Sequence, residues 1–148
     1  MIPTRTTSEH PDFVALVQYL DGELAQRDGD EHAFYHQFNN IDVLTHCIVT
    51  YIATKAVGCG AIKTFDPTTV EVKRMYVLTS QRGKGIASQL LQALEIWAKE
   101  LGNKRCVLET GIRQPEAIAL YEKNGYYRIP NYGQYIGVEN SVCFEKLL

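Results

Sequence analysis

The order of the predicted elements indicates an α+β or mixed α/β sandwich. After the N-terminal segment, two strand-like runs joined by a short turn lie at 43–52 and 57–65. A strand, helix, strand, helix, strand succession then extends to the end of the chain. The first helix of that succession is strongly amphipathic, which is typical of a helix that packs on a sheet. Together these patterns predict antiparallel strands that continue into a mixed sheet with helices packed against it.

The N-terminal part begins with a short strand candidate at 4–7 and a helix over 11–27. Pro11 suits the first helical position. The apolar residues that share one face of this helix are Phe13, Leu16, Val17, Leu20 and Leu24. A second, short helix is predicted over 31–38, so two helices precede the first strand pair.

The strands at 43–52 and 57–65 are separated by a turn near residues 54–55. Asp66 and Pro67 form a second turn, because Asp-Pro favours turn initiation. A third strand follows over 70–78. These three runs are expected to form an antiparallel meander.

The second half alternates between helices and strands. The long helix over 83–101 carries a core stripe at helical spacing, consisting of Ile86, Leu90, Leu94, Trp97 and Leu101. Gly102 is expected to close that helix as a C-terminal cap. A strand over 104–110, a helix over 115–123 and a terminal strand near 141–145 complete the order.

The length and net charge of the chain exclude several classes of protein. A chain of 148 residues is expected to form one domain, 1–148, with a single substantial core. A net charge of −2 argues against a general nucleic-acid-binding protein. No apolar run is long enough to cross a membrane, and the N-terminus lacks the apolar stretch of a signal peptide. A cytoplasmic protein without membrane or nucleic-acid partners is therefore expected.

The four cysteines, Cys47, Cys59, Cys106 and Cys143, form no C-x-x-C pair and have no metal-ligand spacing. They fall mostly inside strand-like runs. The sequence therefore predicts buried, reduced thiols of a cytosolic protein, and no metal site.

The loop between the third strand and the long helix is the strongest functional signal. It reads Arg82-Gly83-Lys84-Gly85-Ile86-Ala87. A glycine-rich turn that enters a helix presents unpaired N–H groups and a positive dipole end, which suit a phosphate or pyrophosphate. Arg82 and Lys84 are expected to add positive charge at its mouth. The P-loop pattern is incomplete because Lys84 is not followed by Ser or Thr, and the dinucleotide pattern is incomplete because Ser88 stands where a third glycine would be.

What remains is the pattern R-x-x-G-x-A, followed downstream by the segment QPEAIALYEKNGY over 114–126. In these two ordered signatures the chain resembles the GNAT superfamily of N-acetyltransferases. The resemblance is specific from residue 57 to the C-terminus and rests on length and pattern before it. It implies a three-layer α/β/α fold with a central mixed sheet, splayed where the cofactor enters.

The resemblance also implies that the cofactor is acetyl-CoA. The loop would hold the pyrophosphate, and the preceding strand would pair with the pantetheine arm, which requires a bulge or splay there. Gln114 stands where the family often has Asn, which leaves that contact open. The implied cofactor residues are Met75, Tyr76, Val77, Arg82, Gly83, Lys84, Gly85, Ile86, Ala87, Ser88, Gln114 and Tyr121.

For catalysis, Tyr121 matches the family's general acid, although a buried phenol in this position can also serve packing alone. Glu109 and Glu71 each match a glutamate that family members use as a base, and a water chain is the third alternative. Either carboxylate could instead pair with Lys73, Arg74 or Lys104.

The acceptor pocket is the least determined part. Glu31, Tyr35, Tyr132 and Tyr135 are its tentative residues, because acidic and aromatic groups suit a cationic amine. The expected partner is a small-molecule or peptide amine, and a homodimer is compatible with the family. A non-catalytic acyl-CoA-binding or regulatory module is the alternative function.

Overall fold

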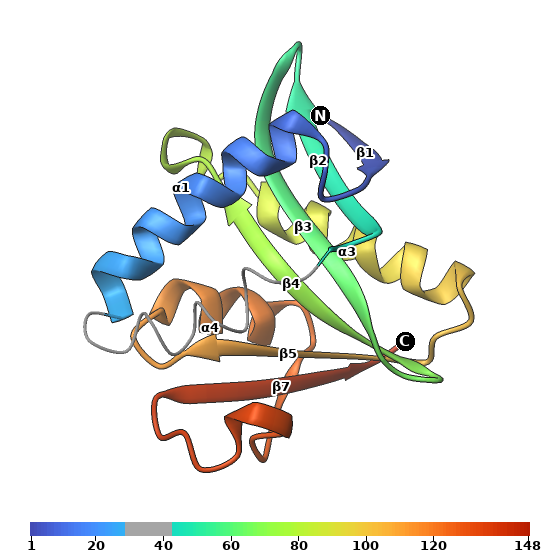
Figure 1. The fold of residues 1–148 in the computed structure, drawn as a ribbon, viewed down its shortest axis with the longest axis vertical. Helices are drawn as coiled ribbons and strands as arrows, with labels where there is room; N and C mark the ends of the chain where they lie inside the picture. Colours follow the sequence, from blue (N-terminus) through green and yellow to red (C-terminus); the bar gives the residue numbers. More distant parts are fainter. Residues whose placement is uncertain (29–42) are drawn as a thin grey trace.

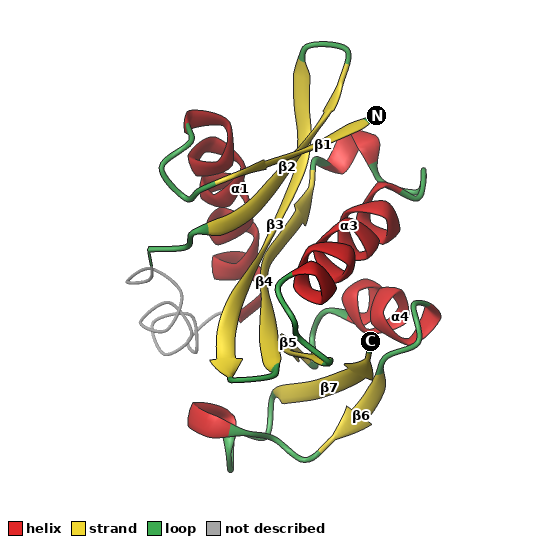
Figure 2. Cartoon of the chain, turned by 90° about the vertical axis from the view of Figure 1, so that its right-hand side faces the viewer, coloured by secondary structure: helices red, strands yellow, loops and turns green. Residues whose placement is uncertain are grey.

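The computed structural model describes residues 1–28 and 43–148. In this part of the chain seven strands form one sheet, with helices on both of its faces (Figures 1 and 2). The strands are β1 (Ile2–Thr6), β2 (His46–Ile52), β3 (Lys55–Asp66), β4 (Thr69–Val77), β5 (Arg105–Gly111), β6 (Tyr127–Ile129) and β7 (Ser141–Leu147). The helices are α1 (Pro11–Asp28), α3 (Ile86–Glu100) and α4 (Pro115–Lys123), with single 3-10 turns η2 (Thr79–Gln81) and η3 (Gly133–Tyr135).

The order of elements predicted from the sequence is confirmed within the described residues, with shifted boundaries, except that the short strand β6 is an addition to it. The long helix begins at Ile86 rather than at residue 83, because Gly83 and Gly85 have φ angles of 79° and 80°. A right-handed helix excludes such angles. The predicted helix over 31–38, with Glu31 and Tyr35, lies outside the described residues.

The sheet is mixed, as expected. Its strand order is β1-β2-β3-β4-β5-β7-β6, and β4–β5 is its parallel pair. That pair is short: Thr69–Glu71 align with Arg105–Val107, and beyond this point the two strands diverge (Figure 1). The divergence is the splay that the family resemblance implies.

A bulge in β4 lies just beyond the start of the splay. Ala61 of β3 aligns with Lys73, but Cys59, two residues earlier, aligns with Tyr76. The strand β4 therefore carries one extra residue, which is the definition of a β-bulge. Arg74, inside it, has a φ of 61°. The expected irregularity before the loop is thus confirmed.

Each face of the sheet has its own core. Phe13 and Leu16 of α1 pack with Cys47, Cys59 and neighbouring apolar residues on one face. The apolar residues of α3 and α4 pack on the other face, so that the molecule has three layers (Figure 2). This confirms the α/β/α arrangement, with the site positioned at the splayed end of the sheet.

The predicted core stripe of the long helix is confirmed for Ile86, Leu90 and Leu94, which are buried, while Trp97 is half-buried. Leu101 departs from the expectation: it is 50% exposed, because it stands at the C-cap where the helix has already ended. Gly102 follows with a φ of 90° and closes the helix as predicted.

The four cysteines are buried and unpaired, as the sequence predicts. None of the helices in the described ranges combines the length and apolar character needed to cross a bilayer.

Candidate active site

Two adjoining cavities lie at the splayed end of the sheet. The larger has a volume of about 420 Å³ and is bounded by α1, the end of β4, the glycine loop and α4. It is lined by all but one of the predicted cofactor residues: Met75, Tyr76, Val77, Arg82, Gly83, Gly85, Ile86, Ala87, Ser88, Gln114 and Tyr121.

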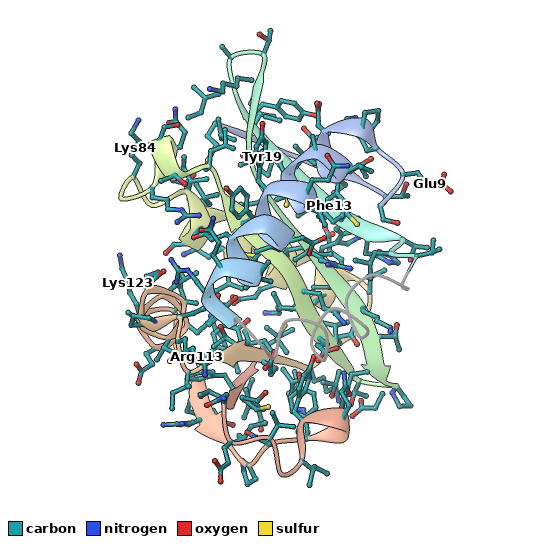
Figure 3. The ribbon with its side chains drawn as sticks, turned by 60° about the vertical axis from the view of Figure 1, so that its left-hand side comes forward. Glu9, Phe13, Tyr19, Lys84, Arg113 and Lys123 are labelled. Carbon is teal, nitrogen blue, oxygen red and sulfur yellow. The ribbon has the colours of Figure 1, made fainter. Side chains whose placement is uncertain are left out.

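Lys84 is the exception. Its ammonium group donates to the side-chain oxygen of Gln81 at 3.0 Å, and it projects from the outer edge of the loop (Figure 3). Lys84 is therefore not part of the cavity lining, and its role in cofactor binding stays a prediction.

The backbone of the loop forms the wall of the larger cavity. Gly85 is the N-cap of α3, and no side chain caps the helix there. The first N–H groups of α3 are therefore left for another acceptor. A Cβ added at Gly83 or Gly85 would meet no atom within 4 Å. Both glycines line the larger cavity, and the space beside them is open, so their backbone is accessible there.

Arg82 lines the larger cavity, and its charge is paired with a carboxylate of α1. Its guanidinium donates to both carboxylate oxygens of Glu23 at 3.0 and 2.7 Å, and its Nε donates to the carbonyl of Val77 at 2.9 Å. It also lies over the ring of Tyr76. The hydrogen bond from Arg82 lowers the pKa of Glu23. Arg82 therefore ties the loop to α1 and β4.

A second arginine spans the larger cavity. Arg27 pairs with Glu23 on its own helix at 3.1 Å and with Glu116 on α4. The sequence patterns identify neither Arg27 nor Glu116 as site residues. The i,i+4 spacing of Glu23 and Arg27 was the available signal, and it indicates an intrahelical pair without revealing the contact to α4.

The smaller cavity, of about 120 Å³, lies beside the larger one. Both are lined by Met75, Gln114 and Tyr121, which therefore stand at their junction. Beyond the junction, the smaller cavity is lined by Glu71, Lys73 and Arg74 of β4, Glu109 and Thr110 of β5, and Tyr135. The divergence of β4 and β5 thus opens the sheet between two compartments.

Tyr121 is buried at this junction, with 6% of its surface exposed. Its ring packs edge-on against Tyr126, with centroids 5.8 Å apart, and at a tilt against Phe144. Its hydroxyl makes no hydrogen bond to the described residues. Burial, followed by the charge of Glu109, raises the pKa of Tyr121 above its ordinary value. The phenol therefore stays protonated at neutral pH, and its ring packs in the core.

Glu109 and Glu71 both line the smaller cavity, on the two diverging strands. Ser141 donates to Glu109 at 2.7 Å. Tyr132 donates to Glu71 at 2.5 Å, and the Lys73 ammonium lies 4.0 Å from Glu71. Two carboxylates of the predicted site are thus brought to one cavity, each fixed by a hydroxyl group.

The two tyrosines tentatively given to the acceptor pocket have different places. Tyr135 lines the smaller cavity. Tyr132 is not part of its lining but stacks edge-on with Tyr135 and Phe65 and donates to Glu71. Burial and the neighbouring Glu71 raise the pKa of Tyr132. Tyr132 therefore positions the carboxylate of Glu71 from outside the cavity lining.

The larger cavity fits acetyl-CoA in its chemistry. The uncapped start of α3 and the open glycine backbone suit a pyrophosphate. The part of β4 beyond Glu71 is aligned with β3 but not with β5, so one of its edges is available to an extended arm. These features define a protein that binds an acylated, phosphate-bearing coenzyme in a split sheet.

The chain belongs to the acetyltransferase (GNAT) family, whose model matches residues 13–126. Acetyl-CoA is the cofactor of this family. The chain is 40% identical over 93 residues to the IAA acetyltransferase of Azospirillum brasilense, covering 62% of this chain and 61% of that protein. It is 52% identical over 79 residues to the uncharacterized N-acetyltransferase YjgM of Escherichia coli, covering 51% and 47%. These matches span about half to three-fifths of the relatives' length.

Among solved structures, an acyl-CoA N-acyltransferase candidate from Klebsiella pneumoniae superposes with a TM-score of 0.83 at 32% identity, covering 99% of this chain and 97% of that one. A GNAT acetyltransferase from Elizabethkingia anophelis, solved with acetyl-CoA bound, gives a TM-score of 0.70 at 19% identity, covering 99% and 97%. The latter likeness shows the fold alone.

Proposed function

We propose that this chain transfers the acetyl group of acetyl-CoA to a primary amine by direct attack in a ternary complex. The observation that supports this most is the position of Tyr121, where the two cavities meet. A cofactor in the larger cavity and an amine in the smaller one would approach each other at this phenol.

Bound acetyl-CoA supplies the acetyl group as a thioester. The backbone of Gly83 and Gly85 and the start of α3 would hold its phosphates, and the splayed edge of β4 would orient its arm. A backbone N–H of β4 directed at the thioester carbonyl would contribute about 10²–10³ in rate, as oxyanion donors do.

The proton transfers are assigned to side chains at the junction and beyond it. Tyr121 donates its hydroxyl proton to the departing sulfur, a role that its raised pKa permits because the phenol stays protonated at neutral pH. Glu109 or Glu71 accepts the proton of the attacking amine, directly or through water.

Direct attack is favoured because the cysteines are poor nucleophiles. All four are buried, and burial raises the pKa of Cys143 to about 11 and that of Cys106 to about 12. Since the thiolate is the reactive form, these thiols are inert at neutral pH.

The test is release of free CoA thiol from acetyl-CoA in the presence of pooled amines, for the wild type and Tyr121→Phe. Loss of the acid is expected to lower turnover by about 10²-fold, the range of general acid catalysis. The affinity for CoA should stay the same. Tyr127→Phe, at an exposed tyrosine of β6, is the matched control and should keep wild-type turnover.

Equal turnover in Tyr121→Phe and the wild type would exclude the phenol from the mechanism. CoA binding without turnover in any amine pool would favour the alternative, a non-catalytic acyl-CoA-binding module.

A further inference from the structure

A buried polar cluster lies in the core next to Tyr121. It is centred on Glu95 of α3, which is only 8% exposed. The Glu95 carboxylate accepts from the Tyr126 hydroxyl at 2.9 Å and from the Lys146 ammonium of β7 at 2.8 Å. Tyr126 is buried as well. None of these three residues lines either cavity, so a ligand in the cavities would not contact the cluster directly.

Stability alone does not account for this cluster. Removing a carboxylate and an ammonium group from water is costly, and well-packed apolar residues in place of a buried ion pair often leave a protein equally stable or more stable. The other buried positions around Glu95 on α3 are apolar, and they include Leu91, Leu94 and Ala98. An apolar side chain would therefore suit this face of the helix, and the polar contacts of Glu95 point to another role.

Tyr126 connects the cluster to Tyr121. The two rings pack edge-on with centroids 5.8 Å apart, and the backbone N–H of Tyr126 donates to the carbonyl of Tyr121 at 3.0 Å. Because the Tyr121 hydroxyl makes no hydrogen bond to the described residues, ring packing sets the direction of its O–H bond. Of its aromatic neighbours in the described part of the chain, Phe144 packs by contact alone, whereas Tyr126 is also anchored through its hydroxyl to Glu95.

The cluster also connects Tyr121 to the helix that borders the larger cavity. Helices α3 and α4 lie side by side on one face of the sheet (Figure 2), and Asn124 at the end of α4 donates to Ser88 of α3 at 3.1 Å. Ser88 lines the larger cavity. Glu95 follows Ser88 by about two helical turns and therefore lies on the same side of α3. Two polar contacts on that side thus hold the end of α4 and the segment after it against α3.

We propose that Glu95 and Tyr126 are positioning residues, which fix the phenol of Tyr121 relative to α3 and to a coenzyme bound at the start of that helix. This inference rests on the proposed acetyl transfer, in which Tyr121 protonates the departing sulfur. Since the coenzyme phosphates would bind at the start of α3, a ring held against the same helix keeps its hydroxyl at a constant distance from the thioester. Lys146 in turn holds the carboxylate of Glu95.

A double-mutant cycle of Tyr121→Phe and Tyr126→Phe tests the proposal by release of CoA thiol from acetyl-CoA with pooled amines. Tyr126→Phe keeps the ring that packs on Tyr121 and removes its bond to Glu95. It should lower kcat roughly tenfold, less than the about 10²-fold that a misplacement of about 1 Å can cost, and leave the KM for acetyl-CoA unchanged. In the Tyr121→Phe background the same substitution should cost no further activity, because residues that act through one group are not additive.

Wild-type kcat in Tyr126→Phe would overturn the proposal, and so would an equal loss in both backgrounds, which indicates a merely structural role. Neither result affects the proposed acetyl transfer as long as Tyr121→Phe itself is slow. Wild-type turnover in Tyr121→Phe would instead exclude the acid, and this inference with it. Tyr51→Phe is the matched control, because it removes a hydroxyl bond of 2.6 Å to the Asp12 carboxylate in the core of the other face and should keep wild-type kcat.

Variants of Glu95 separate the hydrogen bond from packing. Glu95→Leu has no acceptor for the Tyr126 hydroxyl and should lower kcat as Tyr126→Phe does, whereas Glu95→Gln keeps an acceptor and should retain more of it. Equal kcat in the two Glu95 variants would contradict the role of this bond. Where Glu95→Leu does not fold, the cycle with Tyr126→Phe decides.

NMR of the tyrosine rings in the CoA-loaded protein gives a measurement that needs no turnover. The signal of Tyr121 is identified by its loss in Tyr121→Phe. Glu95→Leu does not alter the Tyr121 ring or its aromatic neighbours, so a change in the position or width of that signal must be transmitted through Tyr126. We expect such a change in Glu95→Leu and none in Tyr51→Phe. An unchanged Tyr121 signal in Glu95→Leu would overturn the proposal even where no acceptor has been found.

Discussion

The two cavities at the splay are built in different ways. Part of the lining of the larger cavity comes from a continuous stretch, the end of β4 and the glycine loop into α3. The smaller takes charged side chains from β4 and β5, and these are fixed by residues of the β6–β7 region such as Tyr132 and Ser141. The glycine loop thus borders the larger cavity, whereas charged side chains of two strands border the smaller one.

This difference has a consequence for substitutions. If the loop backbone binds the ligand of the larger cavity, most side chains of the loop can be substituted without loss of binding, as long as glycine remains at the positive-φ positions. Where buried charges bind, a single neutral substitution alters the ligand that is accepted. Substitutions of the loop glycines should therefore change binding in the larger cavity, and neutral substitutions of charged side chains should change binding in the smaller one.

The largest effect is expected from the base. Glu109 is the stronger candidate of the two, because its charge contributes to the raised pKa of Tyr121, which places it close to the acid. Glu109→Gln should lower kcat/KM for the amine by about 10²-fold, the range of general base catalysis, while CoA affinity stays at the wild-type level. Stopped assays of thiol release, with calorimetric CoA titration, measure both quantities.

Glu71→Gln is the matched comparison, on the other diverging strand. If it reduces kcat/KM more than Glu109→Gln does, the assignment of the base is reversed. If either variant binds CoA substantially more weakly, the smaller cavity also contributes to cofactor binding, and the division of roles between the two cavities is wrong.

The second effect concerns the glycine wall. Gly85 lines the larger cavity with a φ of 80°, so Gly85→Ala forces a side chain into the left-handed region, at a cost of roughly 1–2 kcal/mol, at the cavity wall. Gly102→Ala carries the same backbone cost at a φ of 90°, but far from the cavity, at the end of α3. Both should lose similar stability in urea, and only Gly85→Ala should bind CoA about tenfold more weakly, a loss of about 1.4 kcal/mol.

A similar CoA affinity in the two alanine variants would show that the loop backbone does not carry the cofactor. Because both variants have the same backbone strain, a difference in their CoA affinity is due to the position of Gly85 at the cavity.

The two cavities also differ in how well the sequence predicts their residues. The larger cavity follows from a short local pattern, because the spacing of Gly83 and Gly85 before an amphipathic helix encodes its wall directly. Helix and strand order were likewise predictable from local apolar periodicity. The partners of Arg82 were not, since Glu23 is distant in the chain and pairing across the sheet leaves no local signal.

The smaller cavity shows the limit more clearly. Glu71, Glu109 and Tyr121 could be proposed through the family resemblance, but the buried positions of Lys73 and Arg74 depend on a bulge in β4. A bulge is set by the register between two strands, and the sequence of one strand does not specify it.

The smallest effect is expected from substitution of Glu23, which lines the larger cavity and accepts a hydrogen bond from Arg82. The hydrogen bond from Arg82 lowers the pKa of Glu23, so the folded state binds this proton less readily than the unfolded state. The stability that the pair contributes is therefore complete above the ordinary glutamate pKa of 4.5 and is lost as the pH falls through the folded-state value. Glu23→Gln should be less stable than the wild type at pH 7 by at most about 1 kcal/mol, since the pair is partly exposed and screened.

Urea unfolding of both proteins at neutral and acidic pH measures the gap, which should narrow below pH 4.5. A gap that stays constant across this range would mean that the substitution acts through packing of α1 and not through the charge of the pair. CoA affinity in Glu23→Gln should change less than in Gly85→Ala, because Arg82 keeps its hydrogen bond to the carbonyl of Val77 and the glycine backbone remains in place. A larger loss than in Gly85→Ala would show that side chains, too, decide binding in the larger cavity.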